Sequence, residues 1–284
     1  MTRYMPNTAI ALTVALLTAL AMISLASPAQ ADLLISPLRV VMDDGNRNAT
    51  LTLRNTSSGA RTYRLGWVEQ RMDEAGIYHP VEPSTPGHPG ASDMIRFSPR
   101  QITVGPGENQ TVRLSYRPPA GLAAGEYRSH LLFQVLPDVS EPSGTFEVDG
   151  GADGISMQLF MQMSFSLPVI VRQAVSAPAL SIADVAVQPA EQGKPMGLGV
   201  TLRRTGDSSS FGRIVVEAQV DERSPVELIG VLNDIAVFTE AVERRVTVPL
   251  RDTTIPSGAW IRVAYEGTQE YQGRVWDERI FQNR

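Results

Sequence analysis

The chain has 284 residues, a formal net charge of −5 at pH 7 and no cysteine. A mildly acidic protein is poorly suited to bind nucleic acid or an anionic membrane surface, because both attract basic patches. The absence of cysteine excludes thiol catalysis, cysteine-based zinc sites and disulfides.

The first residues resemble an export signal. Arg3 is followed by an apolar run over residues 9–25 and by the sequence Ala29–Ala31, which fits an A-x-A cleavage site. This pattern predicts a signal peptide over residues 1–31 and a mature chain that begins at Asp32. A retained membrane anchor is the alternative, but the apolar run is short for a bilayer span. The remainder is long enough for two domains of ordinary size.

The next part of the chain alternates short β-like segments with turns. The segments are rich in Val, Ile, Leu, Thr and aromatic residues, and Gly, Pro, Asn and Ser separate them. They are Leu33–Met42, Ala49–Asn55, Thr62–Gln70, Gln101–Val104, Gln110–Tyr116, His130–Leu136 and Gly154–Arg172. Short strands in this number predict an immunoglobulin-like β-sandwich over residues 32–172. No long segment with a 3.6-residue period competes with an all-β fold.

A polar, small-residue stretch, Gln173–Pro178, predicts a linker over residues 173–178. Beyond it the short-strand rhythm continues and predicts a second, smaller β-sandwich over residues 179–284. The segments are Ala179–Val187, Leu198–Arg203, Gly212–Val220, Glu227–Val237, Glu243–Leu250 and Trp260–Tyr265. The expected class is therefore all-β, with two immunoglobulin-like β-sandwich domains.

One segment, Ile155–Arg172, has an apolar residue at every second position and no charge before its last residue. A strand places alternate side chains on opposite faces, so these residues form one apolar row. The row consists of Ile155, Met157, Leu159, Met161, Met163 and Phe165. A core strand of a sandwich explains this pattern, since half-buried strands alternate in this way. The three methionines also suit a surface that adapts to partners.

The sequence contains few features of a catalytic, metal-binding or phosphate-binding site. His79, His88 and His130 lack metal-ligand spacing, and we interpret them as solvated loop side chains. The acidic loop Asp149–Gly154 lacks the glutamate that a calcium loop needs at position 12. No nucleophile motif or phosphate-binding glycine loop occurs. We expect no catalytic residue, metal or cofactor, although a secreted hydrolase that uses loop carboxylates stays open as an alternative.

Four segments together carry a family resemblance. They are LLISPLRVVMDDGNRNATLTLRN at 33–55, FSPRQITVGPGENQTVRLSYRPP at 97–119, GEYRSHLLFQVLP at 125–137 and PVIVR at 168–172. In their order and spacing they resemble periplasmic chaperones of the chaperone–usher pilus pathway. The resemblance implies two immunoglobulin-like domains with a cleft between them, in the periplasm of a Gram-negative bacterium. It also implies a chaperone that stabilises pilus subunits by donor-strand complementation and delivers them to an outer-membrane usher.

The resemblance assigns roles to two groups of residues. The apolar row from Ile155 to Phe165 is the donor strand, which fills the groove of an incomplete subunit. Arg39 anchors the terminal carboxylate of the subunit, whereas without the resemblance it would read as a surface arginine in a salt bridge. The family's second cation, a lysine, falls here on Ser166 or Pro168. Arg172 or Arg128 supplies that charge instead, or Arg39 acts with hydroxyl donors such as Ser166 and with backbone donors.

The implied partners are pilus subunits and an outer-membrane usher, with no nucleic acid and no membrane insertion. An exposed apolar strand also predicts self-association of the free chain. The long gap from Pro137 to Gly154 resembles that of the long-loop members of the family, but its only hydrophobic residues are Val139, Phe146 and Val148. We therefore expect an alternate or archaic-like branch. The competing function is a secreted immunoglobulin-like structural or adhesive binding module without chaperone activity, in which the methionine-rich strand is ordinary core.

Overall fold

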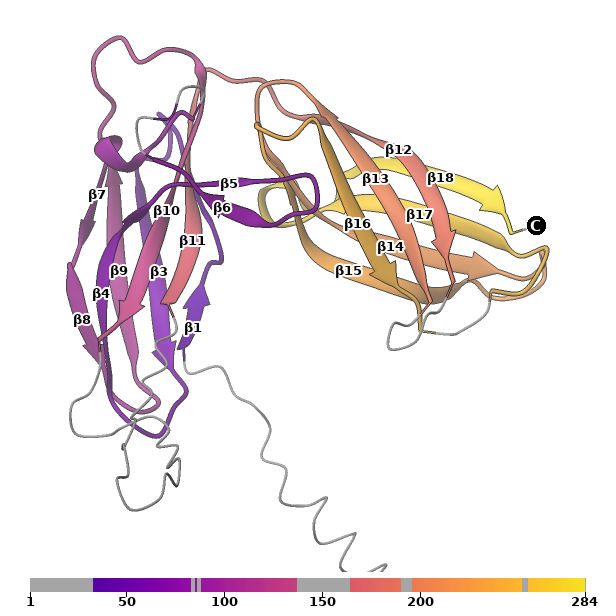
Figure 1. Cartoon of the computed structure of the whole chain (residues 1–284), viewed down its shortest axis with the longest axis horizontal. Helices are drawn as coiled ribbons and strands as arrows, with labels where there is room; N and C mark the ends of the chain where they lie inside the picture. Colours follow the sequence, from indigo (N-terminus) through magenta and orange to yellow (C-terminus); the bar gives the residue numbers. More distant parts are fainter. Residues whose placement is uncertain are drawn as a thin grey trace, which may run out of the picture.

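The computed structural model describes residues 33–82, 85, 88–136, 164–189, 196–251 and 255–283. Within these ranges the regular elements are β-strands and short 3-10 turns, which confirms the all-β prediction. The strands form two β-sandwiches that lie side by side at an angle (Figure 1). None of the helical turns in the described ranges has the length and hydropathy needed to cross a bilayer.

The first sandwich packs the sheet β1-β3-β9-β7 against the sheet β2-β11-β10-β4-β8. Its strands are β1 (Leu33–Ser36), β2 (Val40–Met42), β3 (Asn48–Asn55), β4 (Arg61–Val68), β7 (Ile95–Ser98), β8 (Gln101–Val104), β9 (Asn109–Tyr116), β10 (Gly125–Val135) and β11 (Ser164–Gln173), with the 3-10 turn η1 (Ser92–Met94) before β7. Alternation fills the core between the sheets. In β3, for example, Leu51 and Leu53 are fully buried, while Thr50 and Arg54 are exposed.

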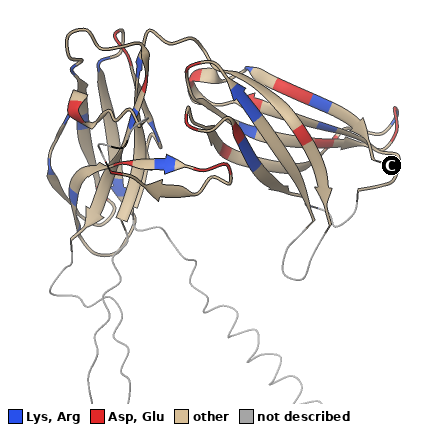
Figure 2. Cartoon of the chain, turned by 45° about the horizontal axis from the view of Figure 1, so that its top comes forward, with Lys and Arg blue, Asp and Glu red and all other residues tan. Residues whose placement is uncertain are grey.

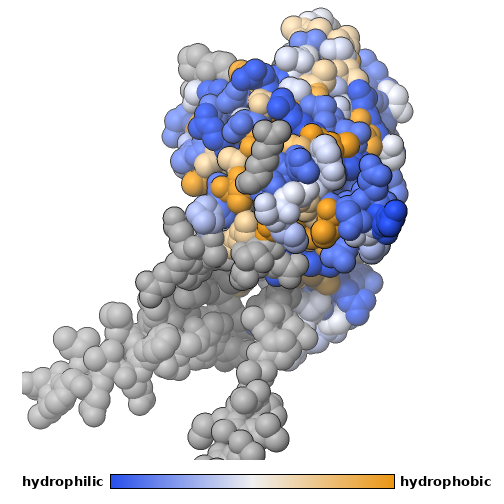
Figure 3. Space-filling model, turned by 90° about the vertical axis from the view of Figure 1, so that its right-hand side faces the viewer, coloured by the Kyte–Doolittle hydropathy of each residue, from blue (hydrophilic) through white to orange (hydrophobic). Residues whose placement is uncertain are grey.

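The second sandwich packs the sheet β12-β13-β16 against the sheet β15-β14-β17-β18. Its strands are β12 (Ala179–Gln188), β13 (Gly197–Thr205), β14 (Ser210–Gln219), β15 (Glu227–Val237), β16 (Glu243–Pro249), β17 (Trp260–Gly267) and β18 (Val275–Gln282), with the turn η3 (Gln269–Tyr271) between the last two. The hydroxyl of Tyr265 in this core donates to the carbonyl of Ile235. The face seen in Figure 3 is mainly hydrophilic, with hydrophobic groups scattered over it.

The first predicted strand, Leu33–Met42, is divided into two strands that belong to different sheets. β1 pairs antiparallel with β3, whereas β2 pairs parallel with β11. Pro37, which follows a cis peptide bond, lies between them and has no N–H to continue a ladder. The prediction of one continuous strand was therefore wrong, and the break places Arg39 directly before β2 in a buried position.

A small hairpin, β5 (Gln70–Met72) and β6 (Tyr78–Pro80), leaves the first sandwich and reaches the second (Figure 1). Its turn carries Glu74, whose carbonyl accepts a hydrogen bond of 2.8 Å from the backbone N–H of Arg245. The side chains of the same two residues form an ion pair of 2.8 Å. Figure 2 shows acidic residues at the tip of the hairpin where it meets the second sandwich. The hairpin thus bridges the two sandwiches.

Candidate functional site in the cleft between the sandwiches

Strand β11 has one face in each of two hydrophobic clusters. Leu167, Val169 and Val171 are buried in the core of the first sandwich. Ile170 points the other way and is fully buried in a cluster shared with the second sandwich. The other buried members of that cluster are Met72, Phe211 and Phe238. The strand therefore forms one wall of the cleft between the sandwiches.

The two edges of β11 are paired unequally. β10 pairs with it along its whole length, from Ser164 to Gln173. On its other edge, β2 pairs only with Val169–Val171. Within the described residues, Ser164–Pro168 consequently has one edge without a neighbouring strand. An unpaired edge is a template for a strand from another chain.

The predicted apolar row leads into this unpaired edge. Phe165 is half-buried and packs against the core of the first sandwich. It has the same parity as Leu167, so Phe165 lies on the inward face of β11. The other five members of the row lie outside the described residues: Ile155, Met157, Leu159, Met161 and Met163.

Arg39 lies in the cleft with only 8% of its surface exposed. Its Nη2 donates a hydrogen bond of 2.9 Å to Oε2 of Glu270 and a weaker one of 3.4 Å to the carbonyl of Thr268. Its guanidinium stacks 3.8 Å from the ring centre of Phe211. The Nε of Arg39 is buried and has no hydrogen-bond partner among the described residues. Arg39 is therefore a buried cation held by the second sandwich.

Arg172, on β11, also contacts Glu270. Its Nε donates 3.0 Å to Oε2 of Glu126, and its Nη2 donates 3.0 Å to the carbonyl of Ser209. Its Nη1 lies 4.0 Å from Oε1 of Glu270. The fold thus brings together two of the predicted anchor residues, Arg39 and Arg172, around one carboxylate.

Among the described residues Ser166 has a different partner. Its hydroxyl donates a hydrogen bond of 3.3 Å to the side-chain oxygen of Gln70 in the hairpin. Because Arg172 shares the Glu270 carboxylate with Arg39, the contacts favour Arg172 over Ser166 as the second residue of the site.

Arg128, the other proposed second cation, is engaged elsewhere in the interface. It stacks 3.8 Å from the ring centre of Phe238, and its Nη1 donates 3.0 Å to Oε2 of Glu240. The stack and the ion pair have the same form as those of Arg39, with a different phenylalanine and a different glutamate of the second sandwich. Hydrogen bonds and the charge of Arg128 outweigh the opposing effect of burial, so the pKa of Glu240 is lowered from its ordinary value.

Sequence reasoning missed the residues with which the second sandwich completes the site. Glu270 lies 231 positions after Arg39, and Phe211 and Glu240 are likewise remote in the chain. None of them lies in a recognisable sequence motif. A single glutamate on a short turn, or a single phenylalanine in a strand, has no characteristic spacing from other functional residues. Only the packing of the two sandwiches reveals their roles.

Two of the three histidines differ from the prediction. His79 has a side chain that is 58% exposed, as expected for a solvated position. His88 and His130 are buried, so the prediction was wrong for them. His88 Nε2 lies 2.9 Å from Glu69, which also accepts 2.6 Å from the Ser129 hydroxyl. Because the glutamate lies between them, this chain of contacts lacks the serine–histidine contact that activates a nucleophile.

His130 has no hydrogen-bond partner for either ring nitrogen among the described residues. It packs edge to face on Tyr78, with ring centres 5.3 Å apart. Burial, with a further contribution from the charge of Arg128, lowers the pKa of His130 to about 3. The imidazole is therefore neutral at physiological pH.

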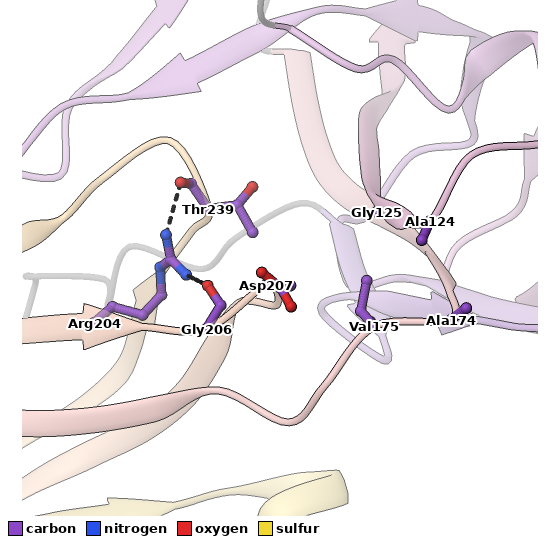
Figure 4. Close-up of a pocket in the computed structure, with 8 residues that line it drawn as sticks. All are labelled: Ala124, Gly125, Ala174, Val175, Arg204, Gly206, Asp207 and Thr239. Atoms are coloured by element: carbon purple, nitrogen blue, oxygen red, sulfur yellow. Dashed lines mark hydrogen bonds between the residues drawn. The ribbon is translucent and has the colours of Figure 1, made fainter.

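A pocket of about 340 Å³ lies where the linker meets both sandwiches (Figure 4). The residues that line it are Ala124, Gly125, Ala174, Val175, Arg204, Gly206, Asp207 and Thr239. Arg204 donates hydrogen bonds to the carbonyls of Gly206 and Thr239, so its charge is already engaged (Figure 4). In the described ranges no cluster of three or more His, Cys, Asp or Glu side chains is placed to hold a metal ion.

No family model and no curated protein matches the sequence. Solved structures that resemble it include chaperones of pilus assembly. The YadV chaperone has a TM-score of 0.43 and 10% identity, over 88% of this chain and 100% of that chain. The SafB chaperone in complex with the SafA pilin of Salmonella enterica has a TM-score of 0.42 and 11% identity, over 90% of this chain and 98% of that chain.

A third similar structure is the CsuC–CsuE chaperone–tip adhesion subunit complex from the archaic chaperone–usher Csu pili of Acinetobacter baumannii. Its TM-score is 0.40 and its identity 14%, over 89% of this chain and 98% of that chain. Values of this size say nothing about activity. The function must be argued from the residues of this chain.

Proposed function

We propose that this chain is a periplasmic chaperone that binds pilus subunits by lending them a strand and delivers them to an outer-membrane usher. The strand is the segment from Ile155 into β11. Binding requires no cofactor and no chemical step. The client is an incomplete immunoglobulin-like subunit with a hydrophobic groove.

The observation that carries the proposal is the unpaired edge of β11 at Ser164–Pro168. A backbone edge offers hydrogen bonds to a subunit that lacks a strand. The apolar row that leads into this edge supplies side chains for the subunit's groove. Because full burial of one such side chain is worth about 1.5–3 kcal/mol, a few of them suffice for tight capture.

The cleft adds a site that recognises the end of the subunit chain. Arg39 and Arg172 converge on one carboxylate, and a chain terminus carries a carboxylate of the same chemistry. A guanidinium held in place by stacking and by neighbouring acids gives the bound strand a fixed register. The unpaired edge and Arg172 lie on β11, and Arg39 directly precedes β2, which pairs with β11 at Val169–Val171. A single extended client segment along β11 can therefore contact the edge and reach the cation pair.

Co-expression with a candidate pilus subunit in a bacterial periplasm tests the proposal. We expect wild type to yield soluble subunit in a one-to-one complex. The triple variant Met157→Glu/Leu159→Glu/Met161→Glu should fold and lose the complex, because three charges enter an apolar groove. The matched control Ser156→Glu/Gln158→Glu/Gln162→Glu adds the same charges to the opposite face and should retain it.

Arg39→Ala completes the set and should reduce recovery of the subunit while the β11 edge is intact. Failure of wild type to recover any subunit would contradict the chaperone function. Equal loss in both triple variants would mean that charge alone, rather than the apolar row, decides binding. Unfolding of the first triple variant would identify the row as core of the chain itself, as the binding-module alternative requires.

A further inference from the structure

Glu270 is the only side chain in the described part of the chain that contacts both Arg39 and Arg172 by ion pairing. It belongs to the short turn η3, which also carries Tyr271. One carboxylate oxygen lies 2.9 Å from Arg39 and the other 4.0 Å from Arg172. The protein's own carboxylate therefore occupies the position between the two cations.

The contact between Glu270 and Arg39 is incomplete. It uses one nitrogen of the guanidinium, and the buried Nε has no partner among the described residues. A guanidinium and a carboxylate pair most strongly through two parallel hydrogen bonds. Arg39 thus has unused donor capacity, which a better placed carboxylate would satisfy.

The two partners differ in how easily they return to water. Glu270 is 31% exposed, so water can solvate its carboxylate once it leaves. Arg39 is 8% exposed and, without Glu270, keeps only a weak bond to the carbonyl of Thr268 and its stack on Phe211. A buried cation without an anion is costly. Departure of Glu270 therefore favours entry of another anion.

Arg172 stays anchored through such an exchange. It retains Oε2 of Glu126 and the carbonyl of Ser209, each at 3.0 Å. With Glu270 in place the cluster has two cations and two carboxylates, so it is neutral. With Glu270 displaced it has one unmatched positive charge, which is the charge of a site for a single carboxylate.

We infer that Glu270 is a built-in competitor that closes the carboxylate site in the free protein, and that the terminal carboxylate of a bound subunit must displace it. The identity of that ligand rests on the proposed chaperone function. The competition itself rests on the contacts of Glu270, Arg39 and Arg172. A consequence is selectivity: weak or misregistered chains without a well placed terminus leave Glu270 in position.

The test measures binding of N-acetylglycine, a small molecule with a terminal carboxylate, and of its amide as the uncharged match. The full chain is labelled with ¹³C and ¹⁵N in arginine, and NMR follows the guanidinium signals of Arg39 and Arg172. The proteins are wild type, Glu270→Gln, and the control Glu278→Gln. Glu278 of β18 pairs with Arg262 of β17, so Glu278→Gln removes the same charge outside the cleft.

Glu270→Gln should bind N-acetylglycine about tenfold more tightly than wild type, a difference of about 1.4 kcal/mol, because the competing charge is gone. Glu278→Gln should bind as wild type does, and no variant should bind the amide. Adding Arg39→Ala to Glu270→Gln should abolish binding. Glu270→Asp, whose shorter side chain keeps the charge, should fall between wild type and Glu270→Gln and provides the comparison if Glu270→Gln does not fold.

Equal affinity in wild type and Glu270→Gln would overturn the inference, and so would equal binding of the amide or no binding to Glu270→Gln. The co-expression experiment separates this inference from the chaperone function. If the protein shows the exchange but recovers no subunit, the chaperone function is contradicted and the role of Glu270 as competitor is supported. If the protein recovers subunit while Glu270→Gln gains no affinity for N-acetylglycine, the chaperone function is supported and the role of Glu270 as competitor is contradicted.

Discussion

At the scale of single residues, the interface relies on two arginines of the first sandwich that each meet a phenylalanine and a glutamate of the second. Arg39 stacks on Phe211, and Arg128 stacks on Phe238, each at 3.8 Å from the ring centre. Stacking lets a cation lie in an apolar interface, and the glutamate balances its charge. Both arginines therefore hold the sandwiches together, and one of them, Arg39, also belongs to the proposed carboxylate site.

His130 gives the protein a pH-dependent stability. Its pKa is lowered from 6.5 to about 3 by burial in the folded state. Below pH 6.5 the unfolded chain binds a proton that the folded chain does not, so stability falls as the pH falls towards about 3. The contribution is about 1.4 kcal/mol per pH unit in that window.

We expect His130→Leu to remove this slope, because leucine does not titrate and fills a similar volume. Urea unfolding of wild type and variant at pH 7, 6 and 5 measures it. His79→Leu is the control, since the His79 side chain is mostly exposed and its loss should change the slope much less. A His130→Leu protein with the wild-type slope would show that other groups cause the acid sensitivity.

At the scale of elements, the hairpin β5–β6 works as a brace between the sandwiches. Its Met72 N–H donates 2.9 Å to Glu240, and the carbonyl of Glu74 accepts 3.1 Å from Nη1 of Arg244. Gly76 closes the turn with φ +84°, a conformation that side chains rarely adopt. A Cβ there would lie 1.9 Å from Nη2 of Arg244.

Gly76→Ala should therefore destabilise the protein in two ways. The left-handed backbone alone costs about 1–2 kcal/mol, and the methyl group also pushes Arg244 away from Glu74. Gly107→Ala is the matched control, because Gly107 has φ +70° and nothing within 4 Å of its would-be Cβ. Urea unfolding should show the larger loss for Gly76→Ala, and small-angle scattering should show a changed arrangement of the sandwiches only for that variant. Equal losses of stability in the two variants, with unchanged scattering, would show that the hairpin does not brace the interface.

The sequence predicts strands with a clear apolar pattern well, even at the edge of a sheet, and misses strands whose pattern is short or interrupted by charges. Gln101–Val104 and Glu227–Val237 have the predicted bounds. The strand β18 was missed because Asp277, Glu278 and Arg279 interrupt its apolar pattern on an edge of the sheet. The hairpin β5–β6 was missed because its strands are short and are held by the second sandwich rather than by their own pattern.

At the scale of the whole molecule, the cleft is a joint product of both sandwiches. The shared cluster around Ile170 fixes their separation, and ion pairs flank it on two sides. The sequence could indicate Arg39 and the apolar row, because both lie in segments with a recognisable pattern. It could not indicate Glu270, since that contact depends on the relative placement of two separately folded sandwiches.

The central claim is that the segment from Ile155 to Pro168 becomes a strand of a bound subunit. Hydrogen exchange read by mass spectrometry, on the free chain and on its purified complex with a pilus subunit, tests it most directly. The account predicts that backbone amides of residues 155–163, and those of residues 164–167 that are not bonded to β10, exchange more slowly in the complex than in the free chain, while those of β12 in the second sandwich are unchanged. Equal exchange of residues 155–167 in the two states would contradict it and would leave β11 as an ordinary strand of its own sandwich.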